Sequence, residues 1–247
     1  MASTSAPEFI LNWHNDDMAR RVARQQPVCW SDVFGNDHPV DLEIGIGNGS
    51  FMVPFLRDHA DRNMIGIEIE VTYLRKADRS LLRQSLTNGR LLVGDAKLLA
   101  WRLFEPESVA DIYVNYPDPW FKKRHAKRRL LNPEFLRLLA TRMRGVLTVA
   151  TDDAEYKDFV LSSITEAGCF ERMFESGFVS HLPDYYETKY ERKWKSEGKT
   201  SYYMKFRKIA QPAVDAEEYA RTQHLQFALN KISERTGTSE ENQRRAS

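Results

Sequence analysis

The 247-residue sequence predicts an α/β fold with a seven-stranded, mostly parallel sheet and helices on both faces. From residue 39 onward, short apolar runs rich in β-branched residues alternate with amphipathic stretches, as in βαβ units. Hydrophobic residues make up 42% of the chain, enough to bury one sizeable core. We therefore expect one domain, residues 39–210, with peripheral segments at both ends.

The expected elements follow in chain order. Residues 1–38 predict a helical lead-in, with Asn15 or Asp16 as an N-cap and Pro27 as a stop. Strands are predicted at residues 40–44, 64–67, 90–93, 111–115, 146–150, 170–176 and 201–206. Helices are predicted at residues 50–59, 71–84, 97–103, 133–143 and 154–166. Residues 211–247 predict one polar helix, residues 215–233, and a disordered tail.

Composition excludes several classes of protein. The sequence contains no run of about 18 apolar residues, and its start lacks the pattern of a signal peptide, so we expect a cytoplasmic protein without a membrane span. The two cysteines, Cys29 and Cys169, form no CxxC pair and lie far apart. We expect reduced thiols and no structural metal.

Positive charge is concentrated in two windows of a chain whose net charge is only +1. Residues 120–144 hold nine Lys and Arg against one Glu, and residues 189–208 hold eight against two. Such clustering in an otherwise acidic chain indicates a polyanion-binding face. The alternative is two ordinary solvated surfaces.

A glycine-rich turn follows the first predicted strand of the domain. Leu42-Glu43-Ile44 runs into Gly45-Ile46-Gly47-Asn48-Gly49, and Glu68 follows 19 residues after Gly49. Glycines at 45, 47 and 49 suit a turn with unusual backbone angles and close approach to a ligand, while an acidic residue at this spacing suits ribose hydroxyls. The pattern predicts a nucleoside cofactor rather than a purely structural turn.

Charge selects among nucleoside cofactors. A carboxylate at Glu43 would oppose the pyrophosphate of a dinucleotide but suits the ammonium and sulfonium of S-adenosylmethionine, so the sequence favours this methyl donor. Asp95 ends a third strand and is placed to accept from the adenine amino group. It could equally be a helix N-cap, and both roles are compatible.

The loop after the fourth predicted strand joins an acidic and an aromatic residue to a basic run. Asn115-Tyr116-Pro117-Asp118-Pro119-Trp120-Phe121 is followed by six Lys and Arg within residues 122–129. A stiff loop offering the Asp118 carboxylate and the Trp120 indole suits a flipped-out base, and the basic run suits phosphates. The alternative is a plain turn with Trp120 as a core anchor.

The same loop carries a family resemblance. The string Tyr116-Pro-Asp-Pro-Trp-Phe-Lys-Lys-Arg-His-Ala-Lys-Arg-Arg-Leu130 resembles the signature of bacterial tRNA (guanine-N7-)-methyltransferases. The strings at residues 151–156 (TDDAEY) and 188–192 (TKYER) resemble further motifs of that family, in the family's order. One departure is that Arg142-Met143-Arg144-Gly145 replaces the usual Gly-Gly turn.

The resemblance implies a class I, Rossmann-like enzyme that methylates a variable-loop guanine of tRNA. By motif position, Glu43, Glu68, Asp95 and Asp118 would line the donor and active site. The residues that would bind the tRNA are Lys122, Asp152, Thr188, Lys189, Tyr190 and Glu191. Whether the protein is a monomer or a homodimer stays open.

Guanine N7 has a free lone pair, so its methylation requires no general base, and catalysis is expected to come from positioning. We expect Asp118 to accept from the guanine N1–H and amino edge and Asp152 to orient the base or a water. We interpret His125 as a phosphate or loop contact rather than an acid or base.

Three other functions remain open at this point. Asp118-Pro119-Trp120 loosely resembles the Asp/Asn-Pro-Pro-aromatic loop of amino-methyltransferases that act on adenine or a glutamine amide, although the second proline is absent. An RNA-binding module without turnover is the second alternative. A dehydrogenase is the third, and Glu43 disfavours it.

Overall fold

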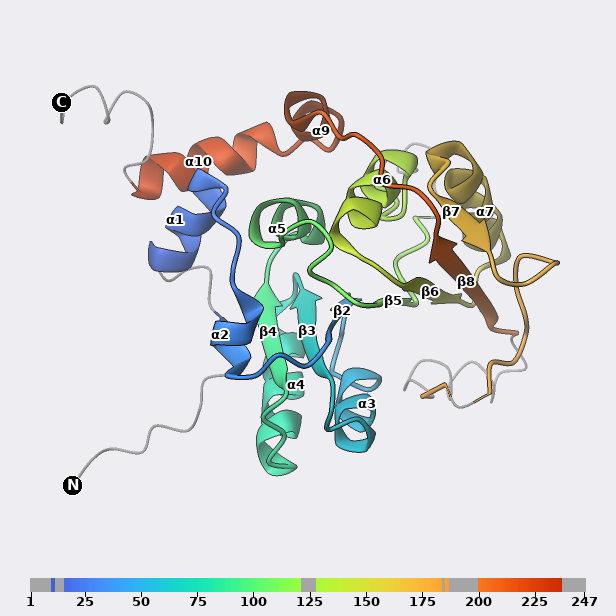
Figure 1. Cartoon of the computed structure of the whole chain (residues 1–247), viewed down its shortest axis with the longest axis horizontal. Coiled ribbons are helices and arrows are strands. Elements are labelled where there is room, and N and C mark those ends of the chain that lie inside the picture. Colours follow the sequence, from blue (N-terminus) through green and yellow to red (C-terminus); the bar gives the residue numbers. More distant parts are fainter. Residues whose placement is uncertain (1–9, 12–15, 121–127, 184, 187–199, 237–247) are drawn as a thin grey trace.

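The computed structural model describes residues 10–11, 16–120, 128–183, 185–186 and 200–236 (Figure 1). Its strands are β1 (Ile10–Leu11), β2 (Val40–Ile44), β3 (Asn63–Glu68), β4 (Gly89–Val93), β5 (Ile112–Asn115), β6 (Val146–Thr151), β7 (Phe170–Arg172) and β8 (Tyr202–Lys208). Its helices are α1 (Asp16–Arg24), α2 (Trp30–Phe34), α3 (Met52–Asp58), α4 (Val71–Arg83), α5 (Ala96–Leu103), α6 (Pro133–Arg142), α7 (Ala154–Ala167), α9 (Ala216–Thr222) and α10 (Gln226–Thr236).

All strands belong to one sheet, in the order β1-β4-β3-β2-β5-β6-β8-β7. The pairs from β1 to β6 are parallel, whereas β8 runs antiparallel to both β6 and β7. The seven predicted strands and the mostly parallel fold class are confirmed. The eighth strand, β1, pairs with the outer edge of β4 and consists of two residues, too few to give a sequence pattern.

Helices cover both faces of the sheet. Strand side chains alternate between the two sides. Leu42, Ile44 and Ile65 pack in the larger core with α5, α6 and α7, while Met64 and Leu91 pack in a second core with α3 and α4. The central strands are therefore buried on both sides, which explains why most of their residues are apolar.

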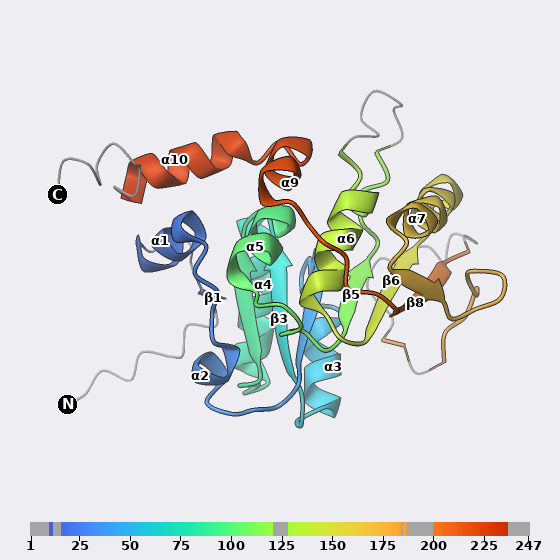
Figure 2. The same cartoon turned by 45° about the horizontal axis from the view of Figure 1, so that its top comes forward.

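The two peripheral segments meet on the α5 side of the sheet. In Figures 1 and 2, α10 lies beside α1, and α9 lies over α5. Ala19 and Val22 of α1 are buried in the same core as Leu229 and Ile232 of α10. The prediction of a single helix over residues 215–233 is wrong, because α9 ends at Thr222 and His224 adopts a left-handed conformation with φ of 57°.

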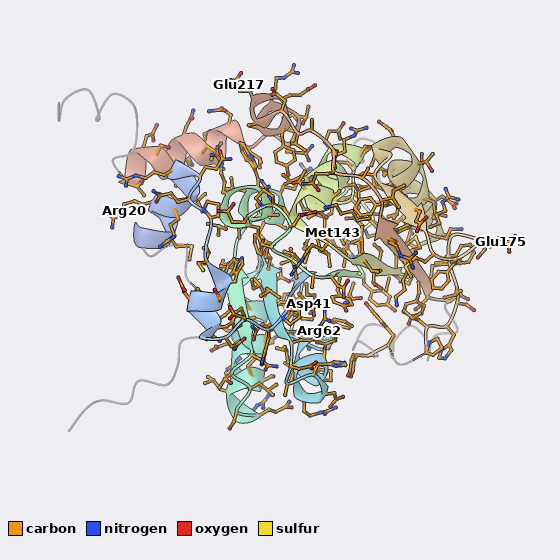
Figure 3. All side chains as sticks on the ribbon, in the orientation of Figure 1. Arg20, Asp41, Arg62, Met143, Glu175 and Glu217 are labelled. Atoms are coloured by element: carbon orange, nitrogen blue, oxygen red, sulfur yellow. The ribbon has the colours of Figure 1, made fainter. Side chains whose placement is uncertain are left out.

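An ion-pair cluster links the amino-terminal ends of β2, β3 and β5. Arg62 donates two hydrogen bonds to Asp41, which is fully buried, and one to Asp111 at 3.0 Å (Figure 3). Burial raises the pKa of Asp41, and the Arg62 guanidinium opposes that rise. This cluster lies at the end of the sheet opposite the carboxyl ends of the strands.

Further expectations concern the cysteines, the membrane and the tail. Cys29 is exposed and Cys169 is buried, and both are free thiols. No helix within the described ranges has the length and apolarity needed to span a bilayer. The predicted disordered tail falls mainly on residues 237–247, which lie outside the described residues.

Candidate active site

A cavity of about 540 Å³ opens at the carboxyl ends of the central parallel strands. Its walls come from the segments that follow β2, β3, β4 and β5 and from the junction of α9 and α10. Ligands of open α/β sheets bind at this edge. The cavity brings together the predicted site residues Glu43, Gly45, Gly47, Glu68, Asp95 and Asp118.

The glycine-rich turn requires glycine for two different reasons. Gly45, Gly47 and Gly49 have φ of 77°, 54° and 78°, in the left-handed region that other residues rarely adopt. A Cβ atom on Gly45 or Gly47 would meet no protein atom within 4 Å, so conformation rather than packing within the described structure selects glycine there. A Cβ atom on Gly49 would also lie 3.0 Å from the Ala77 side chain of α4. The predicted unusual turn is confirmed.

Glu68 ties this turn to the end of β3. Its Oε2 accepts from the Gly47 backbone N–H at 2.9 Å, and its Oε1 accepts from the N–H groups of Ile69 and Glu70 at 2.8 and 3.0 Å. An ionised carboxylate offers about four acceptor positions. Three are occupied here, which leaves room on Oε2 for one further donor.

Glu43 presents a buried carboxyl to the same cavity. Its Oε1 accepts from the Asn115 side-chain amide at 3.1 Å, whereas Oε2 makes no hydrogen bond of normal geometry within the described residues. Burial raises the pKa of Glu43 to about 8, and the Asn115 hydrogen bond and the nearby Met52 N–H lower it less. A buried acceptor of this kind is costly unless it receives a partner.

A tyrosine distant in sequence holds the Asn115 side chain in place. The Tyr185 hydroxyl donates to Asn115 Oδ1 at 2.5 Å, and the Tyr185 ring packs against Phe51 with centroids 5.0 Å apart. Tyr185 lies just before the second basic window, residues 189–208, yet its ring packs against the second core. Asn115 is the first residue of the predicted loop, so its position at a strand end could be read from the sequence. No sequence pattern linked Asn115 to Tyr185.

The loop after β5 is fixed at several points. Tyr116 and Trp120 both adopt left-handed conformations, with φ of 50°, although neither is glycine. The Tyr116 hydroxyl lies 2.9 Å from Ser201 Oγ, and Arg129 donates to the Pro119 carbonyl at 3.0 Å and to Glu155 at 2.6 Å. The Asp118 side chain is consequently presented to the cavity and to solvent.

Trp120 is partly exposed rather than a core anchor. It lines the cavity, and the Arg128 guanidinium lies over its ring, 5.0 Å from the centroid. The alternative of a plain turn with a buried tryptophan is therefore wrong. A partly open indole beside a cation can accept a stacked base.

Asp95 and Asp152 differ in their relation to the cavity. Asp95 caps α5, because its Oδ1 accepts from the Lys97 N–H at 2.8 Å, and it also lines the cavity. Its second oxygen has no such bond within the described chain. Asp152 follows β6 and does not line the cavity. Its neighbour Asp153 caps α7 by accepting from the Tyr156 N–H.

Several predicted substrate residues lie outside the described residues, namely Lys122, His125, Thr188, Lys189, Tyr190 and Glu191. Some described cations of the two basic windows have structural partners. Arg129 pairs with Glu155, Arg137 donates to the Glu166 carbonyl, Arg142 donates to the carbonyls of Ala100 and Trp101, and Lys208 pairs with Glu107. Counting charges by sequence therefore overstates the number that can face a ligand.

The comparison with known proteins agrees with this geometry. A family model described as "Putative methyltransferase" matches residues 37–204. Among solved structures, the 16S rRNA methyltransferase KamB has a TM-score of 0.53 at 16% identity, covering 73% of this chain and 93% of that chain. This likeness concerns the fold, which is that of a methyltransferase domain.

Curated relatives give a narrower family. A tRNA (guanine-N(7)-)-methyltransferase of Thermotoga maritima is 37% identical over 74% of this chain and 58% of that protein. Those of Listeria monocytogenes and Levilactobacillus brevis are 37% and 33% identical, with 80% and 87% of their lengths covered. The chain spans 57–58% of the length of the relatives from Thermotoga maritima, Aquifex aeolicus and Thermus thermophilus. By this similarity the chain belongs to the tRNA (guanine-N(7)-)-methyltransferase family.

Proposed function

We propose that the protein transfers a methyl group from S-adenosylmethionine to N7 of a guanine in the variable loop of tRNA. The observation that carries this proposal is one cavity that joins two kinds of group. Glu43 offers a buried carboxyl whose Oε2 makes no hydrogen bond of normal geometry within the described residues, and Asp118 and Trp120 offer an exposed carboxylate and a partly exposed indole. The Glu43 carboxyl suits a cationic donor, and the Asp118 carboxylate with the Trp120 ring suits a purine.

The residues of the cavity fit the donor group by group. Glu43 Oε2 would accept from the donor ammonium, and the remaining position on Glu68 Oε2 would accept from one ribose hydroxyl. The second oxygen of Asp95 would accept from the adenine amino group. A dinucleotide fits less well, because its pyrophosphate would lie near Glu43 and Glu68. When bound, the donor supplies an electrophilic methyl group on a sulfonium.

The chain's own contribution to catalysis is positioning. The N7 lone pair attacks the methyl carbon without losing a proton, so no general base is needed at this step. Asp118 would accept from the guanine N1–H and amino group, while the Trp120 ring would stack on the base. The loop that carries them is held by the contact of Tyr116 with Ser201 and by the hydrogen bond from Arg129 to the Pro119 carbonyl, and it would keep these two groups in place. Well-oriented reactants of this kind can gain up to about 7–11 kcal/mol.

The tRNA itself would be held beyond the cavity. We assign this role to Lys122, Asp152, Thr188, Lys189, Tyr190 and Glu191, on the strength of their motif positions and of the names of the relatives. Arg128, whose side chain is exposed beside Trp120, would add a phosphate contact next to the base.

The proposal is tested by incubating the full chain with methyl-labelled donor and unmodified tRNA and analysing the nucleosides. We expect labelled 7-methylguanosine. Labelled N6-methyladenosine, or label on protein alone, would identify an amino-methyltransferase instead, and absence of product despite donor binding would indicate a silent RNA-binding module.

Asp118→Asn tests the role of the exposed carboxylate within the same assay. We expect a fall in turnover of at least tenfold, because the amide cannot accept equally from two donors of the guanine edge. Asp61→Asn is the matched control, since Asp61 is an exposed aspartate outside the cavity. Full turnover by Asp118→Asn would remove Asp118 from the mechanism.

A further inference from the structure

We infer that residues 222–225, the turn between α9 and α10, form part of the donor-binding pocket and that His224 contacts the adenine of the donor. We call this turn the C-terminal elbow. Thr222, Gln223 and His224 line the same cavity as Glu43, Glu68 and Asp95. The elbow lies outside residues 37–204, which the methyltransferase family model matches. The identity of the ligand in this inference rests on the proposed function.

The elbow is anchored to the first turn of α5 and to the N-cap of α6. On the α5 side, the Tyr219 hydroxyl donates to the Lys97 carbonyl at 3.1 Å, and the Tyr219 and Trp101 rings lie 5.4 Å apart. Lys97 lies in the first turn of α5, next to its cap Asp95. The elbow therefore lies close to the carboxylate that we assign to the adenine amino group.

On the α6 side, the elbow is anchored through Gln223. The Asn132 side-chain amide donates to Gln223 Oε1 at 2.9 Å, while Asn132 Oδ1 caps α6 by accepting from the Phe135 N–H. Gln223 is 8% exposed, so this bond is largely shielded from water. Gln223 is thus a positioning residue that holds the elbow against the segment leading from the Trp120 loop into α6.

The backbone of the elbow holds His224 in a left-handed conformation. The Leu225 N–H bonds to the Ala220 carbonyl at 2.9 Å, and the His224 N–H bonds to the Arg221 carbonyl at 3.2 Å. These two bonds form a Schellman motif in which His224 occupies the left-handed position, a position where glycine is strongly preferred. A histidine there costs stability that glycine would not. Gln25 and Ser85 occupy the same position at the ends of α1 and α4, so this conformation by itself assigns no ligand to His224.

Left-handed residues cluster at this cavity. Six non-glycine residues of the described chain have positive φ. Three of them, Tyr116, Trp120 and His224, line the cavity, whereas Gln25, Ser85 and Glu107 lie in exposed turns. His224 thus shares with Tyr116 and Trp120 both this conformation and a place on the cavity wall. Its place on the wall is what supports a role in binding.

The chemistry of the elbow fits a purine edge. An imidazole offers a flat aromatic face and N–H and N groups, which suit stacking on or hydrogen bonding to an adenine, and His224 is exposed to the cavity rather than buried. The helix behind it is fixed, because α10 packs on α1 through Leu229 and Ile232. The packing of α1 on α10 therefore supports the side of the cavity that the C-terminal elbow forms.

The test uses the full chain and S-adenosylhomocysteine, the product form of the donor, whose affinity is measured by calorimetry. For His224→Gly we expect an unchanged or higher melting temperature, because glycine suits the left-handed position, and an affinity reduced about three- to tenfold. His224→Asn, which also tolerates this conformation, should show the same loss. Glu217→Gln is the matched control, because Glu217 is exposed on α9 outside the cavity, and it should leave affinity unchanged.

Gln223 supplies the positioning test. Gln223→Ala should weaken S-adenosylhomocysteine binding, and Gln223→Glu should restore it, since Glu keeps an acceptor for the Asn132 amide. Unchanged affinity in both His224 variants would overturn the inference, as would a change confined to the KM for tRNA. If the unmodified chain itself failed to bind S-adenosylhomocysteine, the proposed donor would be wrong, which is a separate result from a failure at His224.

Discussion

The Asn115 side-chain amide donates to Glu43 Oε1 at 3.1 Å, which leaves Oε2 of the same buried carboxyl without a hydrogen bond of normal geometry in the described structure. The Tyr185 hydroxyl donates to Asn115 Oδ1 and so fixes the orientation of that amide. One oxygen of Glu43 therefore orients the carboxyl, and the other is a buried acceptor of a residue that lines the cavity.

Donor binding should release a proton. Because burial raises the pKa of Glu43 to about 8, the carboxyl is mostly protonated at pH 7 before binding, and a cationic donor lowers its pKa. We expect up to about one proton released per donor bound at pH 7, falling toward zero as the pH rises above 8. Calorimetry in two buffers of different ionisation enthalpy measures this number.

Glu43→Gln is the variant for that measurement. It keeps the shape of the side chain but cannot ionise, so it should weaken donor binding and abolish the buffer dependence. Equal binding heats for the unmodified chain in both buffers at pH 7 would show that Glu43 does not ionise on binding.

Gly49→Ala should destabilise the protein more than Gly45→Ala. Both glycines have nearly the same φ, so each substitution should cost about 1–2 kcal/mol of unfolding free energy from conformation. Only Gly49 has Ala77 and Val53 within 3.2 Å of the new methyl group, which adds about 1–3 kcal/mol of overpacking. Denaturant unfolding compares the two, and equal losses would refute the role of the Ala77 contact.

Arg62→Ala should destabilise the fold without affecting the site. Asp41 is fully buried, and removing its partner leaves an unpaired charge, at a cost of about 3 kcal/mol, the lower end of the usual range because the Arg62 side chain is 25% exposed. The pKa of Asp41 is already raised, so its protonated form suits the folded state. The difference in unfolding free energy between Arg62→Ala and the unmodified chain should therefore become smaller as the pH falls toward about 4.

Unfolding curves for Arg62→Ala and the unmodified chain at pH 7 and near pH 4 measure this difference. Arg57→Ala is the control, because Arg57 pairs only with exposed Asp58 in the described structure. A deficit that grew at low pH would contradict the assignment to Asp41.

Trp120 should contribute to turnover on tRNA through its aromatic face. Trp120→Ala removes a stacking surface worth about 1–3 kcal/mol per base, so we expect kcat/KM for tRNA to fall by roughly tenfold or more. Trp120→Phe retains an aromatic face and should retain most of the activity. Steady-state kinetics on tRNA, with S-adenosylhomocysteine affinity as a check on the pocket, distinguishes this from a general defect. Equal activities for the two variants would rule out stacking.

Local sequence patterns predicted most of the fold. The strand at residues 40–44 was predicted with its exact bounds, because Val40, Leu42 and Ile44 are large apolar residues and Gly45 follows immediately. The strand beginning at Phe170 was predicted to extend to residue 176 but ends at Arg172, where a turn closed by the Gly177 N–H begins. The break at His224 was missed, because no glycine, asparagine or proline marks it in the sequence.

The sequence by itself determined the elements, the glycine turn and the identity of the acidic residues at the strand ends, because each depends on neighbours in the chain. Tertiary structure decided which groups share the cavity. Asn115 reaches Glu43 across adjacent strands, Tyr185 reaches Asn115 from 70 residues away, and Gln223 reaches Asn132 from 91 residues away. Such contacts depend on how the strands are ordered and how the chain ends fold back, which no local periodicity encodes.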